Sequence, residues 1–329
     1  MNKILKIAII VDDLFVSDYI ADLINWSENI DSIDISNFIY LVNDKEERLP
    51  TKSRFQKILS IDFWKQYPRR KLKNFIVSFE KKRNLKNNKI HKKLIDKHNL
   101  NNFGLKKIEV NQESTKSKVS FRATQKSIDI LKKEQFDLFI RFNKKIIRGD
   151  LLTVTNFGIL SMHHGSDLNY RGGPSGFWEV YNSDNKSGYI IQQLTEELDN
   201  GNILFRGFIS TQKSWLLNKS ELNIRSFFYL KKIILEISET YELPNFLVNI
   251  PYSKNLNTDP TIFVMIKYLF KKFKNKQDSK KFKNADNRYL VGYQEGEWGS
   301  LNYRNANFIK NPDNTFLADP FIISKNHKN

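Results

Sequence analysis

The sequence contains no cysteine. This absence excludes disulfide bonds, cysteine nucleophiles and thiolate metal sites. The chain also lacks any run of the roughly 20 apolar residues that a membrane-spanning helix needs. Its start, MNKILKIAIIVDD, has a short apolar run that Asp12 and Asp13 end too early for a signal peptide. We therefore expect a cytoplasmic protein.

A glycine-rich phosphate loop is missing as well. Residues 5–11 and 37–42 are short apolar runs typical of buried parallel strands. Residues 17–26 between them have apolar positions at helical spacing, with Ser17 as the expected N-cap. The turn after the first run reads VDDLF, without the G-x-G-x-x-G of dinucleotide-binding folds. This turn argues against a classical NAD enzyme.

Acidic residues are scarce in two segments of a chain whose formal net charge is +18. Residues 51–110 hold 18 Lys and Arg against 4 Asp and Glu, and residues 267–283 hold 8 Lys against one Asp. Because the basicity is local, the overall charge does not indicate nucleic-acid binding. We expect 51–110 to be a basic helical insertion, either a solvated surface or a surface for an anionic ligand. The pattern of the stretch 261–276 predicts a packed helix or a linker. Its lysines would also allow peripheral binding to an anionic inner membrane surface.

Strands alternate with helices through the rest of the chain. Strands are predicted at 137–142, 158–165, 188–194 and 202–208, and helices at 122–135, from about Gly176, and from Asn218, as its N-cap, to Glu239. This order predicts an α/β fold, a Rossmann-like, mostly parallel sheet flanked by helices.

The chain divides into three predicted parts. An α/β domain occupies 1–250 and contains the insertion at 51–110. A basic amphipathic linker follows at 251–285. The remaining residues, 286–329, carry turn and strand signals and are too few for a core of their own. We expect them to be the start of a second domain.

Two adjacent histidines, His163 and His164, end a predicted buried strand. Asp199 follows a later strand in the turn EELDNG. Ligands bind at strand ends in open α/β sheets, and a His and an Asp that meet there can share a proton. Each piece alone is also what an ordinary strand end or hairpin turn contains. The combination therefore carries the prediction of a catalytic site.

The order S-x-H, Y-R-G, F-W, S-G and L-D-N-G-N-I-L over residues 161–204 resembles the formyltransferase superfamily. That family includes methionyl-tRNA, glycinamide-ribonucleotide and sugar N-formyltransferases. The resemblance covers residues 120–240 well and the N-terminal β-α-β unit loosely. It implies a formyltransferase-like fold and transfer of a formyl group from 10-formyltetrahydrofolate to a primary amine, without a metal.

The resemblance places the family's catalytic His on His163 and its catalytic Asp on Asp199. The family's Asn, which helps to hold the developing oxyanion, falls on Ser161, and this departure leaves an active and an impaired site equally open. His164 lies one position away from the spacing of the family's motif. The positions implied for substrate binding are His164, Tyr170, Arg171 and Gly172. Folate binding is expected in the loop Phe142–Leu152, with Phe142, Asn143 and Ile147 as candidates.

A shorter resemblance lies near the end of the sequence. The run FLADPFII at 316–323 resembles the first blade of a five-bladed β-propeller of glycan-related proteins. Together the two resemblances favour an amino sugar or sugar nucleotide as the amine acceptor. Three alternatives stay open: a methionyl-tRNA formyltransferase, a formyl-folate hydrolase, and a catalytically lapsed binding module. The Ser at 161 is the reason to retain the binding module as an alternative.

Overall fold

The structure is a computed structural model, and it describes most of the chain. The described residues are 3–43, 61–115, 119–165, 170–196, 201–248, 256–282, 291–295, 307–309 and 317. The chain forms two compact units, Met1–Ile262 and Phe263–Asn329. The predicted boundaries at 250 and 285 remain predictions.

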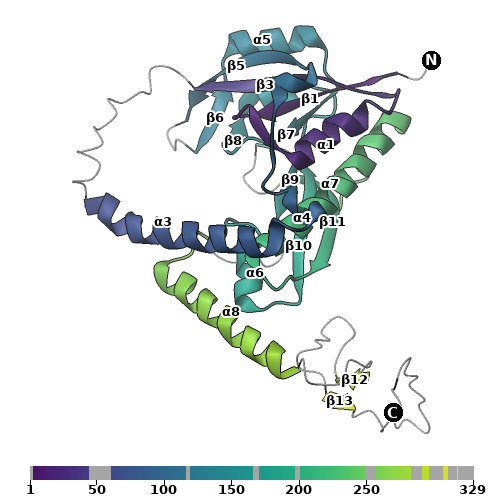
Figure 1. Ribbon diagram of the computed structural model, residues 1–329. Helices are drawn as coiled ribbons and strands as arrows, with labels where there is room; N and C mark the ends of the chain where they lie inside the picture. Colours follow the sequence, from purple (N-terminus) through teal and green to yellow (C-terminus); the bar gives the residue numbers. More distant parts are fainter. Residues whose placement is uncertain are drawn as a thin grey trace. The chain divides into compact units, whose positions relative to one another are not determined.

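The first unit is built on one large sheet (Figure 1). In the described residues its nine strands follow the order β11-β10-β9-β7-β1-β3-β5-β6-β8. The pairs β3–β1, β1–β7, β7–β9 and β3–β5 are parallel, whereas β9–β10, β10–β11 and β5–β6 are antiparallel. The strands are β1 (Leu5–Val11), β3 (Ile33–Asn43), β5 (Lys106–Ser114), β6 (Ser120–Ala123), β7 (Leu138–Arg141), β8 (Ile146–Arg148), β9 (Ile159–His164), β10 (Lys186–Gln193) and β11 (Asn202–Ser210). The predicted α/β fold with a mostly parallel sheet is confirmed.

Strand β1 shows why its sequence is a continuous apolar run. Its side chains alternate between the two faces of the sheet. Leu5, Ile7 and Ile9 pack into one core cluster, and Ala8 and Ile10 pack into the other. All five are 0% exposed, because helices cover both faces.

Helices α1 (Asp18–Ser27) and α7 (Trp215–Thr240) cover the first face, and α5 (Gln125–Glu134) covers the second (Figure 1). Shorter helices are η3 (Leu100–Phe103), η4 (Gly149–Thr153) and α6 (Phe177–Asn182). The prediction that Asn218 caps the long helix is wrong, since α7 begins one turn earlier after Ser214. Asn218 is 0% exposed inside the helix, where its amide donates to the Gly176 carbonyl (3.0 Å) and the Ser187 hydroxyl (2.8 Å).

The basic segment, residues 61–99, is largely helical, as predicted. It contains α3 (Ile61–Glu80), the π-helical turn η2 (Lys81–Leu85), α4 (Lys89–Lys92) and β4 (Lys97–Asn99). β4 pairs antiparallel with β2 (Phe15–Ser17) next to the first strand. The predicted insertion at 51–110 runs too far, because from Lys106 onward the chain is β5 of the main sheet.

Side-chain hydrogen bonds attach the basic segment to the sheet domain. The Glu80 carboxylate accepts the backbone N–H of Leu216 at 2.8 Å, in the first turn of α7. The Asn84 amide donates to the Ser214 hydroxyl at 2.8 Å. His91 on α4 lies 3.0 Å from the Ser220 hydroxyl. The segment is therefore fixed against the N-terminal half of α7.

In the second unit the structure describes α8 (Ile262–Phe282) and an antiparallel pair, β12 (Val291–Tyr293) with β13 (Asn307–Ile309). The predicted propeller motif at 316–323 lies outside the described residues except for Leu317. Across the described parts of both units, no helix combines the length and apolarity needed to cross a bilayer.

Candidate functional site

The sheet has a topological switch point at β1. Along the chain, the order moves from β1 outward through β3 and β5, then returns to the other side of β1 with β7 and β9. In open α/β sheets ligands bind at the carboxyl ends of the strands beside such a switch point. Two pockets lie at these strand ends.

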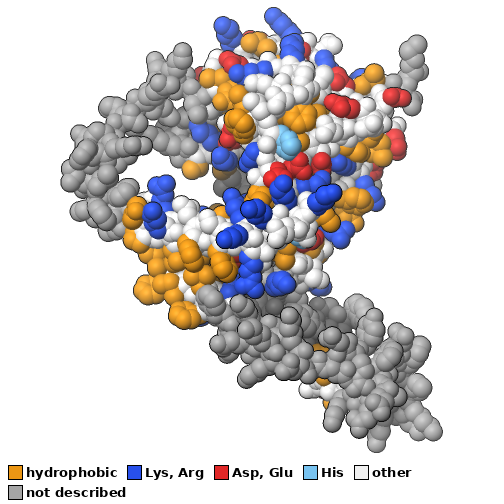
Figure 2. Space-filling view, in the orientation of Figure 1, with side chains coloured by type: hydrophobic (Ala, Val, Ile, Leu, Met, Phe, Trp, Pro, Cys, Tyr) orange, Lys and Arg blue, Asp and Glu red, His pale blue; other side chains and the backbone are white. Residues whose placement is uncertain are grey.

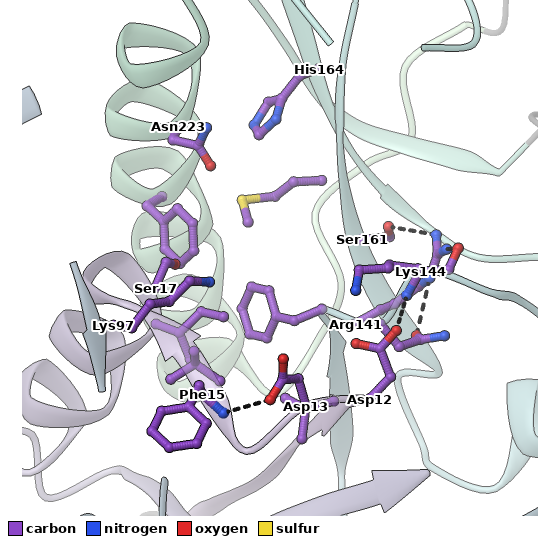
Figure 3. Close-up of a pocket in the computed structure, with 17 residues that line it drawn as sticks. Asp12, Asp13, Phe15, Ser17, Lys97, Arg141, Lys144, Ser161, His164 and Asn223 are labelled. Carbon is purple, nitrogen blue, oxygen red and sulfur yellow. Dashed lines mark hydrogen bonds between the residues drawn. The ribbon is translucent and has the colours of Figure 1, made fainter. Parts of the chain in front are cut away.

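The larger pocket encloses about 420 Å³ (Figure 3). Its walls come from the end of β1, β2, the start of β4, the loop after β7, the end of β9 and the middle of α7. The lining residues that bear on its chemistry are Asp12, Asp13, Lys97, Arg141, Lys144, Ser161, His164 and Asn223. The floor is apolar, with Met162 and Phe227. The pocket thus places carboxylates at the β1 end and cations beside β4 and β7.

The smaller pocket encloses about 70 Å³ on the other side of β9. His163 lines it, whereas His164 lines the larger pocket. Consecutive residues of a strand point to opposite faces, so the adjacent histidines serve different pockets. Ile146, Ile147 and Leu194 give the smaller pocket apolar walls. Arg141, Ser161 and Met162 line both pockets, which therefore adjoin at the ends of β7 and β9.

Arg141 organises the loop after β7, although it belongs to none of the motifs recognised in the sequence. Its guanidinium donates to the Asn143 side chain (3.2 Å) and to the carbonyl oxygens of Lys145 (3.1 Å) and Lys144 (3.4 Å). A fourth contact reaches the hydroxyl of Ser161 at 3.5 Å. The only sequence signal for Arg141 is its place at the end of a predicted strand, beside Ser161 in the parallel register.

The predicted folate-binding loop divides between the two pockets. Phe142 and Asn143 line the larger pocket, and Ile147 lines the smaller one. The Asn143 amide donates to the Lys145 carbonyl at 2.7 Å. The backbone N–H of Lys144 donates to Asp12 at 3.1 Å, so the loop is also attached to the end of β1.

His164 is held neutral at physiological pH. Burial lowers its pKa to about 3, and the neighbouring His163 and Lys219 lower it further in the same direction. Its Nε2 lies 2.7 Å from the hydroxyl of Ser226 on α7. In Figure 3 its ring lies opposite Asn223, which comes from the same helix.

Asp199 lies outside the described residues, as do all of residues 197–200. The described residues on either side of this gap include Thr195 and Gly201, and both line the smaller pocket with His163. Glu196 accepts a hydrogen bond from the backbone N–H of Gly149 and pairs with Arg148 (Nη1–Oε2 3.5 Å).

The predicted residues Tyr170, Arg171 and Gly172 lie away from the linings of both described pockets. The Tyr170 hydroxyl donates to Asp184 and accepts from the Asn182 amide at 2.8 Å. Gly172 forms a bridge with Asn257, and its φ is +91°. A Cβ at Gly172 would lie 2.2 Å from the Asn257 carbonyl oxygen, so the close approach of the two chain segments requires a glycine.

Helix α6, which follows this loop, contains a buried acid. Glu179 is 1% exposed, and its Oε1 has no hydrogen-bond partner among the described residues. Burial, together with the negative charge of Asp184, raises the pKa of Glu179 to about 7.

A group of lysines adjoins the His164 end of the larger pocket. Burial lowers the pKa of Lys219 on α7, and Lys73, Lys97 and Lys81 of the basic segment lower it further. Lys97 lines the pocket itself, and Lys219 lies one helical turn from the pocket residue Asn223. Lys73 is neutralised by Asp259 (2.7 Å). The folded chain thus brings Lys219 near lysines that are distant in sequence.

Within the described residues, no three His, Asp or Glu side chains lie close enough together to hold a metal ion. No protein-family model matches the chain, and no curated protein matches it.

Solved structures similar to the chain include three formyl-handling enzymes. A sugar N-formyltransferase from Shewanella sp FDAARGOS_354 is 15% identical over 80% of this chain and 87% of that chain, with a TM-score of 0.43. A phosphoribosylglycinamide formyltransferase from Anaplasma phagocytophilum is 13% identical over 72% and 88%, with a TM-score of 0.44. A formyltetrahydrofolate deformylase from Pseudomonas putida KT2440 is 10% identical over 72% and 67%, with a TM-score of 0.41.

Proposed function

We propose that the chain is a folate-dependent N-formyltransferase that moves a formyl group from 10-formyltetrahydrofolate to a primary amine of an amino sugar. The observation that carries this proposal is the pair of adjoining pockets at the ends of β7 and β9. They share Arg141, Ser161 and Met162, and the two histidines face them separately. A transfer between two bound molecules needs two such sites that meet at the reacting atoms.

The smaller pocket suits the formyl group of the donor. Its apolar wall of Ile146, Ile147 and Leu194 can pack against the donor's aromatic ring, while His163 and Ser161 face the formyl oxygen. The loop after β7, fixed by Arg141, offers backbone groups to the remainder of the folate. Because the smaller pocket has little volume, we assign only the formyl end of the donor to it.

The reaction proceeds by addition and elimination. The acceptor nitrogen attacks the formyl carbon, and the carbonyl oxygen becomes an oxyanion in a tetrahedral intermediate. His163 donates a hydrogen bond to this oxyanion, and Asp199 takes a proton from the attacking nitrogen. The bond from the formyl carbon to N10 then breaks, and N10 receives a proton. The products are the N-formylated amine and tetrahydrofolate.

Arg141 supports an active rather than an impaired site in spite of the Ser at 161. A serine hydroxyl is shorter than an asparagine amide and offers one donor. The Arg141 guanidinium lies 3.5 Å from that hydroxyl and lines the same pocket. A fixed positive charge beside the developing oxyanion stabilises it in the role that the family's asparagine otherwise fills.

The larger pocket supports an acceptor that carries both an amine and an anionic group. Asp12 and Asp13 lie at one end, and Lys97 and the nearby Lys219 lie at the other. Neighbouring lysines lower the pKa of Lys219, and a bound anion would offset their repulsion. A phosphate-bearing amino sugar fits this polarity.

Calorimetric titration with a stable 10-formyltetrahydrofolate analogue tests the donor. We expect wild-type chain and His164→Ala to bind it with micromolar affinity, because His164 faces the other pocket. Formyl transfer to phosphorylated amino sugars, followed by mass spectrometry, then tests the reaction with the same proteins and with His163→Ala and Asp199→Ala. The absence of binding heat at millimolar analogue would refute the proposal.

The same measurements separate the alternatives. Analogue binding without transfer to any amine, unchanged in Ser161→Asn, would indicate a lapsed binding module. Release of formate without an acceptor would indicate a hydrolase. Transfer only to charged initiator tRNA, with affinity that depends on tRNA identity, would indicate a methionyl-tRNA enzyme.

A further inference from the structure

Helix α3 exposes aromatic side chains along one face. Tyr67, Phe75 and Phe79, here called the aromatic stripe, are 39%, 58% and 42% exposed. Phe75 and Phe79 are four residues apart and lie next to each other on the helix surface, and Tyr67 is eight residues before Phe75 on the same outward half of the helix. The rings of Phe75 and Phe79 stack with centroids 6.3 Å apart. Three large aromatic side chains thus lie in line on the surface, where each exposed ring is unfavourable in water.

Basic side chains accompany the stripe. Lys71 lies over the Tyr67 ring at 5.4 Å, and Arg83 lies over the Phe79 ring at 5.9 Å. Residues 66–95 contain eleven Lys and Arg and a single acidic residue, Glu80. Glu80 is only 3% exposed, and two of the cations, Lys73 and Lys92, pair with the carboxylates of Asp259 and Asp96. Figure 2 shows Lys and Arg side chains gathered over α3 beside hydrophobic ones.

The opposite face of α3 is fixed to the first unit. Arg69 donates to the Pro260 carbonyl at 3.1 Å, Lys73 pairs with Asp259 at 2.7 Å, and Glu80 accepts from Leu216 at 2.8 Å. Ile76, between these contacts, is 1% exposed. The helix is therefore anchored through one face while the stripe stays outward.

We infer that the exposed face of α3 is a docking surface for an anionic phospholipid membrane. Lysine and arginine side chains attract anionic headgroups, at about a fivefold gain in affinity for each charge near the surface. Phenylalanine and tyrosine rings insert at the depth where headgroups meet acyl chains. The exposed phenylalanines favour a bilayer over a nucleic-acid duplex, because a duplex offers phosphates without an apolar layer to receive the rings.

Vesicle co-sedimentation tests this surface. The probes are vesicles of phosphatidylcholine alone and vesicles in which about a third of the lipid is phosphatidylglycerol. We expect the chain to pellet with the anionic vesicles only. Phe75→Ser/Phe79→Ser and Lys71→Glu/Lys82→Glu should each reduce the bound fraction about tenfold or more.

Matched controls separate the stripe from general properties of the chain. Phe228 on α7 is 50% exposed and lies under Lys232, so Phe228→Ser removes a comparable ring elsewhere. Lys132→Glu/Lys133→Glu on α5 makes the same change in net charge at exposed positions. Both controls should pellet like the wild type. Circular dichroism and urea unfolding should show that all four variants are folded.

Three results would overturn the inference. The first is that the chain fails to pellet with anionic vesicles, and the second is that Lys132→Glu/Lys133→Glu reduces pelleting as much as Lys71→Glu/Lys82→Glu. The third is that single-stranded RNA binds the stripe more tightly than vesicles and displaces them. Formyl transfer in solution is a separate readout, and the stripe variants should leave it unchanged. Failure of the membrane inference is thereby distinguishable from failure of the proposed function.

Discussion

Strand β1 and helix α3 both carry several large apolar side chains, but they use them in opposite ways. All but one of the β1 residues are buried, and they pack into two clusters between helices. On α3, Phe75 is 58% exposed while its neighbour Ile76 is 1% exposed. Apolar burial therefore stabilises the sheet domain from within, whereas the basic segment contributes one anchored face and one outward face. The candidate site belongs to the first arrangement and the proposed docking surface to the second.

The largest effect is expected at the strand ends. His163→Ala should lower formyl transfer about 10²- to 10⁴-fold, because it removes the donor to the oxyanion. His164→Ala should mainly raise the KM for the acceptor, since this side chain lines the other pocket. Steady-state kinetics with both substrates varied separate these effects. Equal loss of kcat in the two variants would contradict the division of the pockets.

The contrast within α3 is testable by stability. Ile76→Ala should lower the free energy of unfolding by about 2–4 kcal/mol, through lost burial and the cavity that remains. Phe75→Ala should change it by less than about 0.5 kcal/mol, because the ring is already in solvent. Urea unfolding at one pH compares the pair. A large loss in Phe75→Ala would show that the stripe packs against something within the chain.

A smaller effect is expected where residues 170–173 meet 256–257. Gly172→Ala should cost about 2–3 kcal/mol, because it combines a positive φ with a backbone clash at the Asn257 oxygen. Gly104→Ala is the matched control. Its φ is +68° but no atom lies within 4 Å, so it should cost only about 1–2 kcal/mol. Similar melting temperatures for the two variants would show that the backbone contact between Gly172 and Asn257 is not the reason for a glycine at this position.

The smallest effect per measured step is a pH dependence from Glu179. Its pKa is about 7 in the folded state, against 4.5 for an ordinary glutamate, so between these values the folded state holds a proton that the unfolded state releases. This contribution to stability is complete below pH 4.5 and is lost as the pH rises through 7, at no more than about 1.4 kcal/mol per pH unit. Glu179→Gln should flatten the dependence in urea titrations. The exposed Glu28→Gln should leave it unchanged.

Much of the sheet is predictable from the sequence because burial on both faces produces continuous apolar runs. β1 and β9 are recognisable for this reason. β6 and β8, with four and three residues, are too short for a hydrophobic pattern to distinguish from loop. Asn218 misleads because asparagine is a good helix cap, whereas here its amide satisfies buried groups on α6 and β10.

The residues of the candidate site also divide into those that the sequence predicts and those that it does not. His163 and Ser161 are recognisable from a motif that is continuous in sequence, and strand alternation then assigns the two histidines to different sides. Lys219 is not recognisable, because its neighbours Lys73, Lys81 and Lys97 come from a distant part of the chain. Tyr170 and Gly172 belong to the same motif but serve hydrogen bonding and close packing in this structure.

The position of the basic segment between two paired strands has a consequence for how freely it can vary. β3 and β5 lie side by side in parallel, although the chain between Asn43 and Lys106 includes the whole segment. The entropy lost on closing a loop rises only with the logarithm of its length, by about 0.6 kcal/mol for each doubling. The sheet therefore tolerates a long excursion at this point almost as easily as a short one. New surface chemistry can be added there at little cost to the strands whose ends form the candidate site.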